Sequence, residues 1–544
     1  MKTRRICLLL IICLLTMPLI GQVIERKRPV EWENLIEGGC YMDRFLPMPP
    51  GKLSDKVWGS KNVLPRYIDN GIEYPDISFW GGNILKGEDG EYHLFVCGWA
   101  EKSPKGHMTW PKSIVYHTIS PNLHGPYIIQ DTIGSGHNPE AFTLEDGRIV
   151  IYVKNRNYYI ADTVDGPWTY KRFNYNTRDR KIIEGLSNQT FARRQDGSYL
   201  MVCRGGGTWI SRTGISPYNQ ITEKCAYPNV EGRFEDPVVW RDSLQYHLIV
   251  NDWLGRVAFY QRSKDGVHWV TEQGEAYAPG ISYHKDGHVE KWFKYERAKV
   301  YQDKEGRAMQ MNFAVIDTIK HLDLGNDNHS SKNVCIPLKK DLLLSVLNTT
   351  PIQSSTPEIR VRIAAEEGFN PEKELDIPSL RFGSFTEVNF GRGCKPLSWK
   401  KQGKDLIVTF DGEGNGITPE EFAPKLIGKD KKGDFVIGYA RLPYVDYTPP
   451  LLSALCPKYD DIDKLWKVEV QNFGLSVSKE TTMKVTYGKE VIGETVVNAL
   501  KPYEKTILTI HSDIIADKEE AFIVTFYREG KELAINKFFY SSHK

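Results

Sequence analysis

The sequence contains no pair of cysteines separated by two residues, and its nine cysteines are scattered over 544 positions. This spacing excludes zinc sites built on paired cysteines and a dense disulfide framework, so buried free thiols are the ordinary interpretation. An excess of one charge is also absent, because 71 Lys and Arg stand against 69 Asp and Glu. We therefore expect no basic surface that gathers nucleic acid or an anionic membrane, and a neutral or small partner instead.

Beyond its N-terminus the sequence has no apolar run close to the roughly 20 residues that a membrane span needs. The first 21 residues have a basic head at 2–5 and an apolar stretch at 6–20, which is typical of a secretory signal peptide. Cys13 lies inside the apolar stretch, which argues against a lipoprotein. We expect residues 1–21 to be removed and the mature protein to be secreted, into the periplasm or the extracellular medium, without membrane insertion.

A repeat organises the first 320 residues. An Asp-containing turn followed by a strand of alternating apolar residues occurs five times, and the turn aspartates lie 46 to 61 residues apart. This spacing suits one four-stranded sheet per repeat, as in a β-propeller. The five segments are Glu88–Val96, Glu145–Val153, Gln195–Cys203, Arg241–Val250 and Gln302–Phe313.

A second signature, a Gly-containing turn with an aromatic residue, falls between the first ones. It is typical of an outer hairpin in each sheet. Together the two interleaved signatures predict a five-bladed β-propeller. The second signature occupies Ser120–Tyr127, Thr163–Trp168, Ser211–Tyr218 and Ser263–Trp269.

The repeat stops near Cys335, and short strands separated by Gly, Pro and charged turns follow. The strand series after Pro449 resembles an immunoglobulin-like sandwich. The sequence thus predicts an all-β chain with a catalytic propeller at 22–335, an accessory β-sandwich at 336–448 and a C-terminal immunoglobulin-like β-sandwich at 449–544.

The segments that precede the repeat turns should carry the chemistry, because the first strand of each propeller blade lines the central axis. Acidic residues recur in these segments, and buried carboxylates are costly unless they are paired or used. They could instead brace adjacent blades through salt bridges. The candidate catalytic residues are Asp76, Glu140, Glu235, Asp236 and Glu296.

Two carboxylates on either side of a sugar perform glycoside hydrolysis, one protonating the leaving oxygen and the other activating water or attacking the anomeric carbon. A third acid nearby raises the pKa of the proton donor. Polar and cationic residues would bind hydroxyls or a carboxylate, and tryptophans would stack on the sugar ring. The expected substrate-binding residues are Trp80, His137, Asn188, Arg204, Arg233, Trp253 and Arg297.

The motifs HNPEAF, SNQTF, GRFEDPVVW and YERAKV resemble those of five-bladed propeller glycoside hydrolases related to families 43, 32 and 68, over roughly Asn34 to Asp317. Some secreted bacterial proteins of this type are described as sucrases or family 43-like hydrolases. The resemblance implies an Asp base or nucleophile in the first blade. It also implies an Asp that stabilises the transition state and a Glu proton donor in a later blade.

Counting back six residues from the turn aspartates gives Glu140 in the second repeat and Asp236 in the fourth, but Asn83 in the first. Asp76 could supply the missing acid or could be part of a turn. Asp236 fits the transition-state position, with Glu235 as second choice, because adjacent strand residues face opposite ways unless a bulge intervenes. Glu140 is the leading candidate for the general acid, with Glu296 in reserve.

Other functions remain open. A glycoside phosphorylase, as in family 130, needs no base, and the Gly-rich stretch Cys203–Trp209 with Arg204, Arg233 and Arg297 could hold phosphate. The same arginines could bind a uronic or sulfated glycan, or the propeller could bind glycans without catalysis. We expect no cofactor and no metal, His137 being a structural histidine rather than a calcium ligand. The sugar, the linkage and the oligomeric state stay open.

Overall fold

The structure is a computed structural model that describes residues 23–57, 60–182, 186–514, 516 and 520–539. Strands make up 47% and helices 5% of the chain, so the prediction of an all-β protein is confirmed. The predicted signal peptide at 1–21 lies outside the described residues. None of the helices in the described ranges has the length and apolar character needed to cross a membrane.

Within the described ranges, five mainly antiparallel sheets follow one another from residue 77 to residue 337. The first contains β3 (Ile77–Lys86), β4 (Tyr92–Ala100), β5 (Ile114–Ser120) and β6 (Ile128–Ser135). The second contains β7 (Glu140–Thr143), β8 (Ile149–Val153), β9 (Asn157–Ala161) and β10 (Thr169–Arg172). The third contains β11 (Tyr175–Asn176), β12 (Thr190–Arg193), β13 (Tyr199–Val202), β14 (Thr208–Ser211) and β15 (Tyr218–Gln220). The fourth contains β16 (Phe234–Arg241), β17 (Tyr246–Asp252), β18 (Val257–Ser263) and β19 (Val270–Thr271), and the fifth β20 (Lys294–Gln302), β21 (Ala308–Ile316) and β22 (Ser331–Pro337).

Each of the two sequence signatures recurs at its own connection between strands in successive sheets. The Asp turns join the first strand to the second, and the Gly-aromatic turns join the third to the fourth, where β12 counts as the first strand of the third sheet because β11 pairs with β15 at its outer edge. Each turn aspartate accepts a hydrogen bond at 2.8 to 3.2 Å from the backbone N–H two residues further on, which is the Asx-turn geometry that explains the recurrence of Asp. These aspartates are Asp89, Asp146, Asp196, Asp242 and Asp303.

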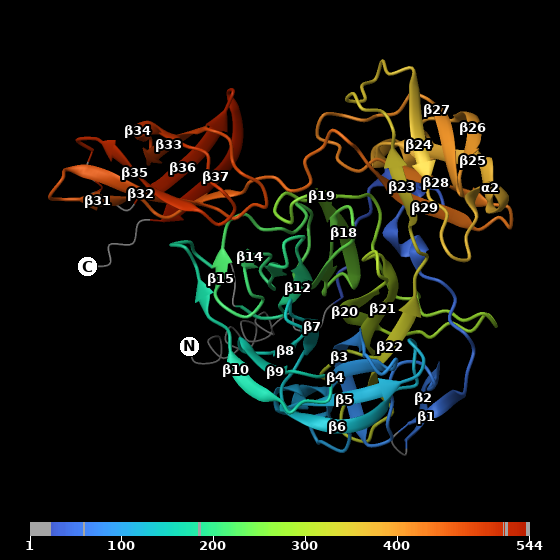
Figure 1. Ribbon diagram of the computed structural model, residues 1–544. Coiled ribbons are helices and arrows are strands. Elements are labelled where there is room, and N and C mark those ends of the chain that lie inside the picture. The colour runs from blue at the N-terminus through green and yellow to red at the C-terminus, as the bar shows by residue number, and fades with distance from the viewer. Residues whose placement is uncertain (1–22, 58–59, 183–185, 515, 517–519, 540–544) are drawn as a thin grey trace, which may run out of the picture.

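The first strands of the five sheets lie side by side around a common centre (Figure 1). Hydrogen bonds join each of these strands to the next around the ring. The connections are Asn83 to Ala141, Glu140 to Phe191, Thr190 to Val239 and Asp236 to Arg297. The fifth sheet closes the ring, because the Asn333 side chain on β22 donates to the Gly81 carbonyl of β3 at 2.8 Å.

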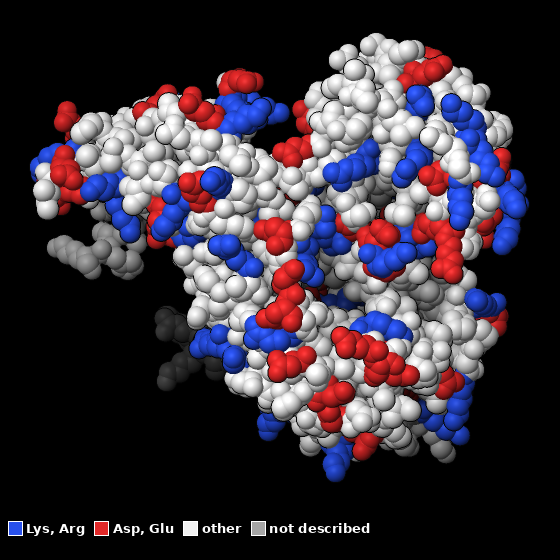
Figure 2. Space-filling model, viewed as in Figure 1, with Lys and Arg blue, Asp and Glu red and all other residues white. Residues whose placement is uncertain are grey.

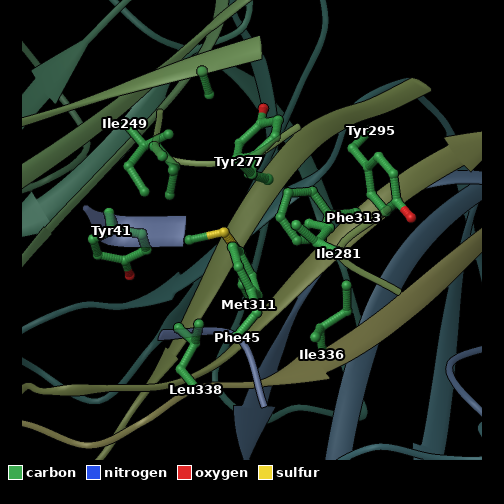
Figure 3. Packing of buried hydrophobic residues seen from close by; sticks show 14 of the residues in the cluster. Tyr41, Phe45, Ile249, Tyr277, Ile281, Tyr295, Met311, Phe313, Ile336 and Leu338 are labelled. Atoms are coloured by element: carbon green, nitrogen blue, oxygen red, sulfur yellow. The ribbon is translucent and has the colours of Figure 1, made fainter. Parts of the chain in front are cut away.

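The N-terminal segment packs against the fourth and fifth sheets. It contains the short 3₁₀ helices η1 (Val30–Asn34) and η2 (Tyr41–Arg44) and the hairpin β1 (Leu53–Val57) and β2 (Ser60–Tyr67), while η3 (Gly106–Lys112) follows β4. Figure 3 shows Tyr41 and Phe45 among the buried residues of these sheets, including Met311 and Phe313. The Phe45 and Phe313 rings lie 5.9 Å apart. This apolar core fixes the sheets that carry β16 and β20.

The next domain is one seven-stranded sheet with two short helices, α2 (Pro371–Glu374) and α3 (Phe385–Val388). Phe382 and Phe410 have ring centroids 5.4 Å apart although four strands separate β25 from β27 in the sheet order, so the sheet folds back on its own core. Its strands are β23 (Leu342–Val346), β24 (Glu358–Ile363), β25 (Leu375–Gly383), β26 (Pro396–Gln402), β27 (Asp405–Asp411), β28 (Lys425–Asp430) and β29 (Phe435–Arg441).

The C-terminal domain has two sheets around one apolar core. Buried and partly exposed residues alternate along β32, as expected for a strand with one buried face. Trp466 of one sheet and Phe522 of the other have ring centroids 5.1 Å apart. One sheet contains β30 (Leu452–Ala454), β31 (Lys458–Asp460), β32 (Leu465–Asn472) and β35 (Lys505–His511), and the other β33 (Thr481–Tyr487), β34 (Glu490–Val497), β36 (Ala521–Arg528) and β37 (Lys531–Phe539).

Candidate active site

One residue of each first-strand segment has a left-handed backbone conformation. The φ angles lie between 48° and 66°, a region that residues other than glycine seldom adopt. In β3, β16 and β20 the strand register shifts at this residue, as in a β-bulge. The recurrence in five consecutive sheets shows a repeated structural feature rather than local strain. The five residues are Gly81, Asn138, Asn188, Asp236 and Arg297.

The bulge in β16 turns two adjacent carboxylates toward the same neighbours. The Asn188 amide donates to Glu235 Oε1 at 3.0 Å and to Asp236 Oδ1 at 2.8 Å. In a regular strand these two side chains would face opposite ways. The structure therefore places both Glu235 and Asp236 at the centre, where the sequence alone left a choice between them.

Asp236 is held by donors from two sides. Arg297 donates to Asp236 Oδ1 through its guanidinium and to Asp236 Oδ2 through its backbone N–H at 3.3 Å. The carboxylate and the guanidinium are both buried, with 3% of each side chain exposed. A buried charge of this kind is stable only when it is paired and hydrogen-bonded. Asp236 is thus fixed in place and has little room to reach a ligand.

Glu235 and Glu296 complete a group of three carboxylates with Asp236, which we call the acid cluster. Burial, then the negative charges of Asp236 and Glu296, raise the pKa of Glu235 to about 7, against the opposing effects of Arg204 and Lys320. The Glu235 side chain keeps 25% of its surface exposed. A carboxyl group that is protonated near neutral pH and open to solvent suits a proton donor.

Cationic side chains border the acid cluster. Lys320 Nζ lies 2.5 Å from Glu296 Oε2, and Lys294 Nζ lies 3.8 Å from Glu296 Oε1. Arg204 Nε lies 3.3 Å from Glu235 Oε1. On the molecular face seen in Figure 2, by contrast, residues of both signs are interspersed.

The two predicted stacking residues differ in access. Trp80 is buried, with Lys320 Nζ 4.8 Å from its ring centroid and the His107 ring centroid 4.5 Å away in an edge-to-face arrangement. Trp253 is half-buried, and Lys294 Nζ lies 5.0 Å from its ring. Arg233 is exposed beside it. Of the two, Trp253 offers the more accessible face to a sugar.

Glu140 lies deeper in the ring than the acid cluster. It stands two residues after the Asn138 bulge, level with Val238 and Lys299, so Glu140 and Asp236, which the same count back from the turns selected, lie at different levels. Glu140 Oε2 pairs with Lys299, and its Oε1 accepts from the Thr190 hydroxyl at 3.0 Å. These contacts place Glu140 between β7, β12 and β20, at one end of a cavity of about 350 Å³ lined by the continuing first strands.

Two other predicted residues lie beside the site rather than in it. The His137 Nδ1 atom is 2.9 Å from the Ser113 hydroxyl, and burial lowers the pKa of this imidazole well below its usual value. Asp76 precedes β3 and has an exposed side chain, while its backbone carbonyl accepts from the Glu101 N–H. Among the described contacts, none joins Asp76 to the acid cluster.

Sequence reasoning missed Lys294 and Lys320. Lys294 lies two residues before Glu296 on β20, and this spacing puts both side chains on one face of a strand, which was a usable signal. Lys320 lies in the segment between β21 and β22, outside the repeat, and gave no signal.

One group in the described residues has the composition of a metal site, namely His93, His117 and Asp165. The two imidazoles already bond to each other, with His93 Nδ1 and His117 Nε2 2.7 Å apart. This pair lies on β4 and β5, away from the first strands that carry the acid cluster. We assign no metal to it.

No protein-family model matches the chain, and no curated protein matches it. Solved structures that are similar include Zg3597, a family 117 glycoside hydrolase from the marine bacterium Zobellia galactanivorans. It has a TM-score of 0.39 and 12% identity, covering 49% of this chain and 88% of that one. An α-L-arabinofuranosidase from Lactobacillus brevis has a TM-score of 0.33 and 13% identity, covering 47% and 90%.

A variant of the family 43 protein BlXynB from Bacillus licheniformis has a TM-score of 0.32 and 12% identity, covering 86% of this chain and 90% of that one. Family 43 is one of the families that the sequence motifs resemble.

Proposed function

We propose that the five sheets are the blades of a β-propeller and that the chain is a secreted glycoside hydrolase acting on an oligo- or polysaccharide at the acid cluster. The observation that carries the proposal is Glu235, a partly exposed carboxyl with its pKa raised to about 7 beside two further carboxylates. Glycoside hydrolysis requires such a pair of carboxyl groups in different protonation states.

In this proposal Glu235, rather than Glu140, donates a proton to the glycosidic oxygen. Asn188 and Arg204 contact Glu235 Oε1 and orient the carboxyl group. Glu140 is less suited to this role because both of its oxygens are engaged, by Lys299 and by Thr190 and the Phe191 N–H. As the C–O bond breaks, the leaving sugar takes the proton, and Glu235 is left as a carboxylate.

Glu296 is the second carboxyl group. It either removes a proton from the attacking water or attacks the anomeric carbon itself. The ion pair with Lys320 and the nearby Lys294 orient its carboxylate. Asp236, fixed by Arg297, contributes a negative charge that favours the positively charged transition state and raises the pKa of Glu235.

The cationic border favours a particular kind of substrate. Four cations, Arg204, Lys294, Arg297 and Lys320, contact the three carboxylates of the acid cluster. The exposed Arg233 adds a further positive charge at Trp253. A uronic or sulfated glycan would bind there through charge-assisted hydrogen bonds. The same cations could hold inorganic phosphate, so a glycoside phosphorylase is the second candidate.

The test is release of reducing sugar from a panel of neutral, uronic and sulfated oligosaccharides, with and without phosphate. Glu235→Gln should lower kcat/KM by about 10²- to 10⁴-fold, since this is the usual contribution of a general acid. Glu231→Gln is the matched control, because that side chain is 86% exposed at the start of the same segment.

Release that requires phosphate would establish the phosphorylase. Full activity of Glu235→Gln, with activity lost in Glu140→Gln, would return the acid role to Glu140. A wild type that binds but does not cleave any glycan would leave a glycan-binding propeller.

A further inference from the structure

The segment between β21 and β22, residues 317–330, presents Lys320 to the acid cluster and also carries an acidic group of its own. Asp317, Asp323 and Asp327 lie on this segment, and Glu101 approaches from the end of β4. The His107 N–H donates to the Asp323 carbonyl at 3.3 Å, so the turn after β4 packs directly on the segment. We call these four residues the second carboxylate group.

Asp323 is the unusual member. Its exposed fraction is 0%, and neither carboxylate oxygen has a hydrogen-bond donor among the described residues. Glu101 is 2% exposed; its Oε2 accepts from the Ser78 hydroxyl, and a hydrogen bond from the Asn326 backbone also favours its charged form. Buried carboxylates in native proteins are nearly always paired, hydrogen-bonded or bound to a metal.

The surrounding charges make the arrangement more unfavourable still. In the described part of the chain, no lysine or arginine forms an ion pair with any of the four carboxylates; His329 lies 3.5 Å from Asp317, His107 packs on the segment through its backbone, and Lys320 pairs with Glu296 instead. Burial and then the charge of Glu101 raise the pKa of Asp323 to about 8, and burial and then the charge of Asp327 raise that of Glu101 to about 7. A positive charge between them would remove this repulsion.

We propose that Asp323 and Glu101 bind a Ca²⁺ ion, with Asp317 and Asp327 contributing to the negative field around it. The unpaired groups are all carboxylate oxygens, which hard divalent cations prefer, and Ca²⁺ accepts irregular sets of six to eight oxygens, whereas Mg²⁺ demands a near-ideal octahedron. Asp327 already accepts from the N–H groups of Leu324 and His329, at 2.8 and 2.7 Å, which shapes the segment around the ion.

The ion would link the turn after β4 to the segment that presents Lys320. Lys320 lies three residues before Asp323 and pairs with Glu296, so the bound ion fixes the position of a residue in the acid cluster. This consequence for catalysis rests on the proposed function. The binding of Ca²⁺ does not.

The experiment uses the full mature chain, stripped with EGTA and titrated with CaCl₂ by calorimetry. We expect one Ca²⁺ ion to bind and, at saturation, the melting temperature to rise by at least about 3 °C. Asp323→Asn should abolish both effects. In EGTA it should melt at or above the wild-type temperature, because it removes like-charge repulsion; a merely structural role for Asp323 would lower that temperature instead.

Asp461→Asn, an exposed aspartate in the C-terminal domain, is the control and should bind Ca²⁺ as the wild type does. Glu101→Gln provides a second variant if Asp323→Asn fails to fold, and it should weaken binding at least tenfold. Absence of Ca²⁺ binding to the wild type, or unchanged binding in both variants, would overturn the proposal. Because binding is measured without substrate, this result is independent of whether the chain hydrolyses glycans.

Discussion

Glu235 and Asp236 are neighbours in the sequence, yet their carboxylates have different surroundings. Asp236 is enclosed and accepts hydrogen bonds from Arg297, whereas Glu235 keeps part of its surface open and has Arg204 as its nearest cation. The bulge makes this possible by turning both side chains inward. One residue supplies fixed charge, and the other can exchange a proton.

The protonation of Glu235 predicts the pH dependence of activity. The proton donor must be protonated, and a pKa of about 7 leaves about half of Glu235 protonated at pH 7, so kcat/KM should fall as the pH rises above about 7. Arg204→Gln removes a cation that lowers this pKa, so the falling limb should move to higher pH by about one unit. The pH profile of kcat/KM measures both effects.

Arg233→Gln is the control for this experiment, because Arg233 is exposed and stands over Trp253 rather than against Glu235. This variant should keep the falling limb of the pH profile where the wild type has it. If Arg204→Gln leaves the limb in place, the group that titrates there is not Glu235.

At the scale of the strands, the bulge that recurs in the first strands could not be predicted from the sequence. The Asp turns were recognisable because an Asx-turn requires that side chain. However, Glu140 of β7 and Val238 of β16 occupy equivalent inner positions. The turn aspartate follows Glu140 by six residues and Val238 by only four. β16 and β20 carry the same bulge, but their turns begin sooner, so a fixed count misaligned Glu140 with Asp236.

Which face a strand residue occupies depends on its hydrogen-bond partners, and these lie in a neighbouring strand. The order and type of the sheets followed from local turn chemistry and alternation, whereas the bulge depends on pairing between β16 and β17. The roles of Lys320 and Asp323 could not be predicted either, because the segment that carries them has neither apolar alternation nor a repeat signature. Their role arises only from contacts with β20 and the turn after β4.

Two adjacent glycines in β3 test the bulge directly. Gly81 has φ of 66°, and a Cβ added there would approach no atom closer than 3.6 Å, whereas one on Gly82 would lie 2.3 Å from the Phe95 carbonyl oxygen. Gly81→Ala should therefore cost only about 1 to 2 kcal/mol for the left-handed backbone. Gly82→Ala should cost more, by at least about 2 kcal/mol, since a backbone atom must move.

Urea unfolding of the two variants gives both values, and each serves as the control for the other because the chemical change is identical. Equal losses of stability would show that backbone conformation alone, and not the close approach of β4, sets the requirement for glycine in this strand.

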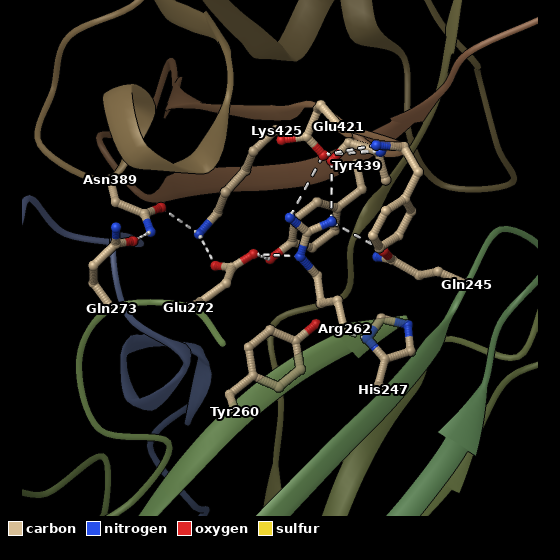
Figure 4. A network of polar contacts seen from close by, with 12 residues as sticks. Gln245, His247, Tyr260, Arg262, Glu272, Gln273, Asn389, Glu421, Lys425 and Tyr439 are labelled. Carbon is tan, nitrogen blue, oxygen red and sulfur yellow. Dashed lines mark hydrogen bonds and ion pairs between the residues drawn. The ribbon is translucent and has the colours of Figure 1, made fainter. Parts of the chain in front are cut away.

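At the scale of the whole molecule, buried arginines attach both accessory domains to the sheets of the ring. Arg178 and Arg180 bond to Ser453 at the start of the C-terminal domain. On the other side Arg262, from β18, pairs with Glu272 and lies 3.9 Å from Glu421 (Figure 4). The connections are made with backbone carbonyls and charged groups rather than with apolar surface alone.

Glu272 is the central group of the second attachment. Its carboxylate accepts from Lys425 of β28 at 3.0 Å and from the Tyr439 hydroxyl of β29 at 2.8 Å, besides pairing with Arg262. Figure 4 shows these side chains converging from the ring and from the seven-stranded sheet. Removing one partner from a buried network leaves the others uncompensated, which is the costly case.

This network should make the attachment sensitive to acid. Burial alone would raise the pKa of Glu272, but Lys425 and Arg262 outweigh it and lower the pKa from 4.5 to about 2. A lowered pKa means stability that is fully present above about pH 4.5 and lost as the pH falls towards 2. The difference corresponds to about 3 kcal/mol at neutral pH. Glu272→Gln lacks this contribution, so its deficit in urea unfolding should be large at pH 7 and should shrink markedly by pH 3.

Glu420→Gln, a change at an exposed residue in the same domain, should match the wild type at both pH values. A Glu272→Gln deficit that stays constant from pH 7 to pH 3 would mean that the carboxylate contributes through shape and hydrogen bonding rather than through charge. The domain would then be attached mainly by contacts that do not need the Glu272 charge, such as the hydrogen bond from the Arg262 guanidinium to the Ala423 carbonyl.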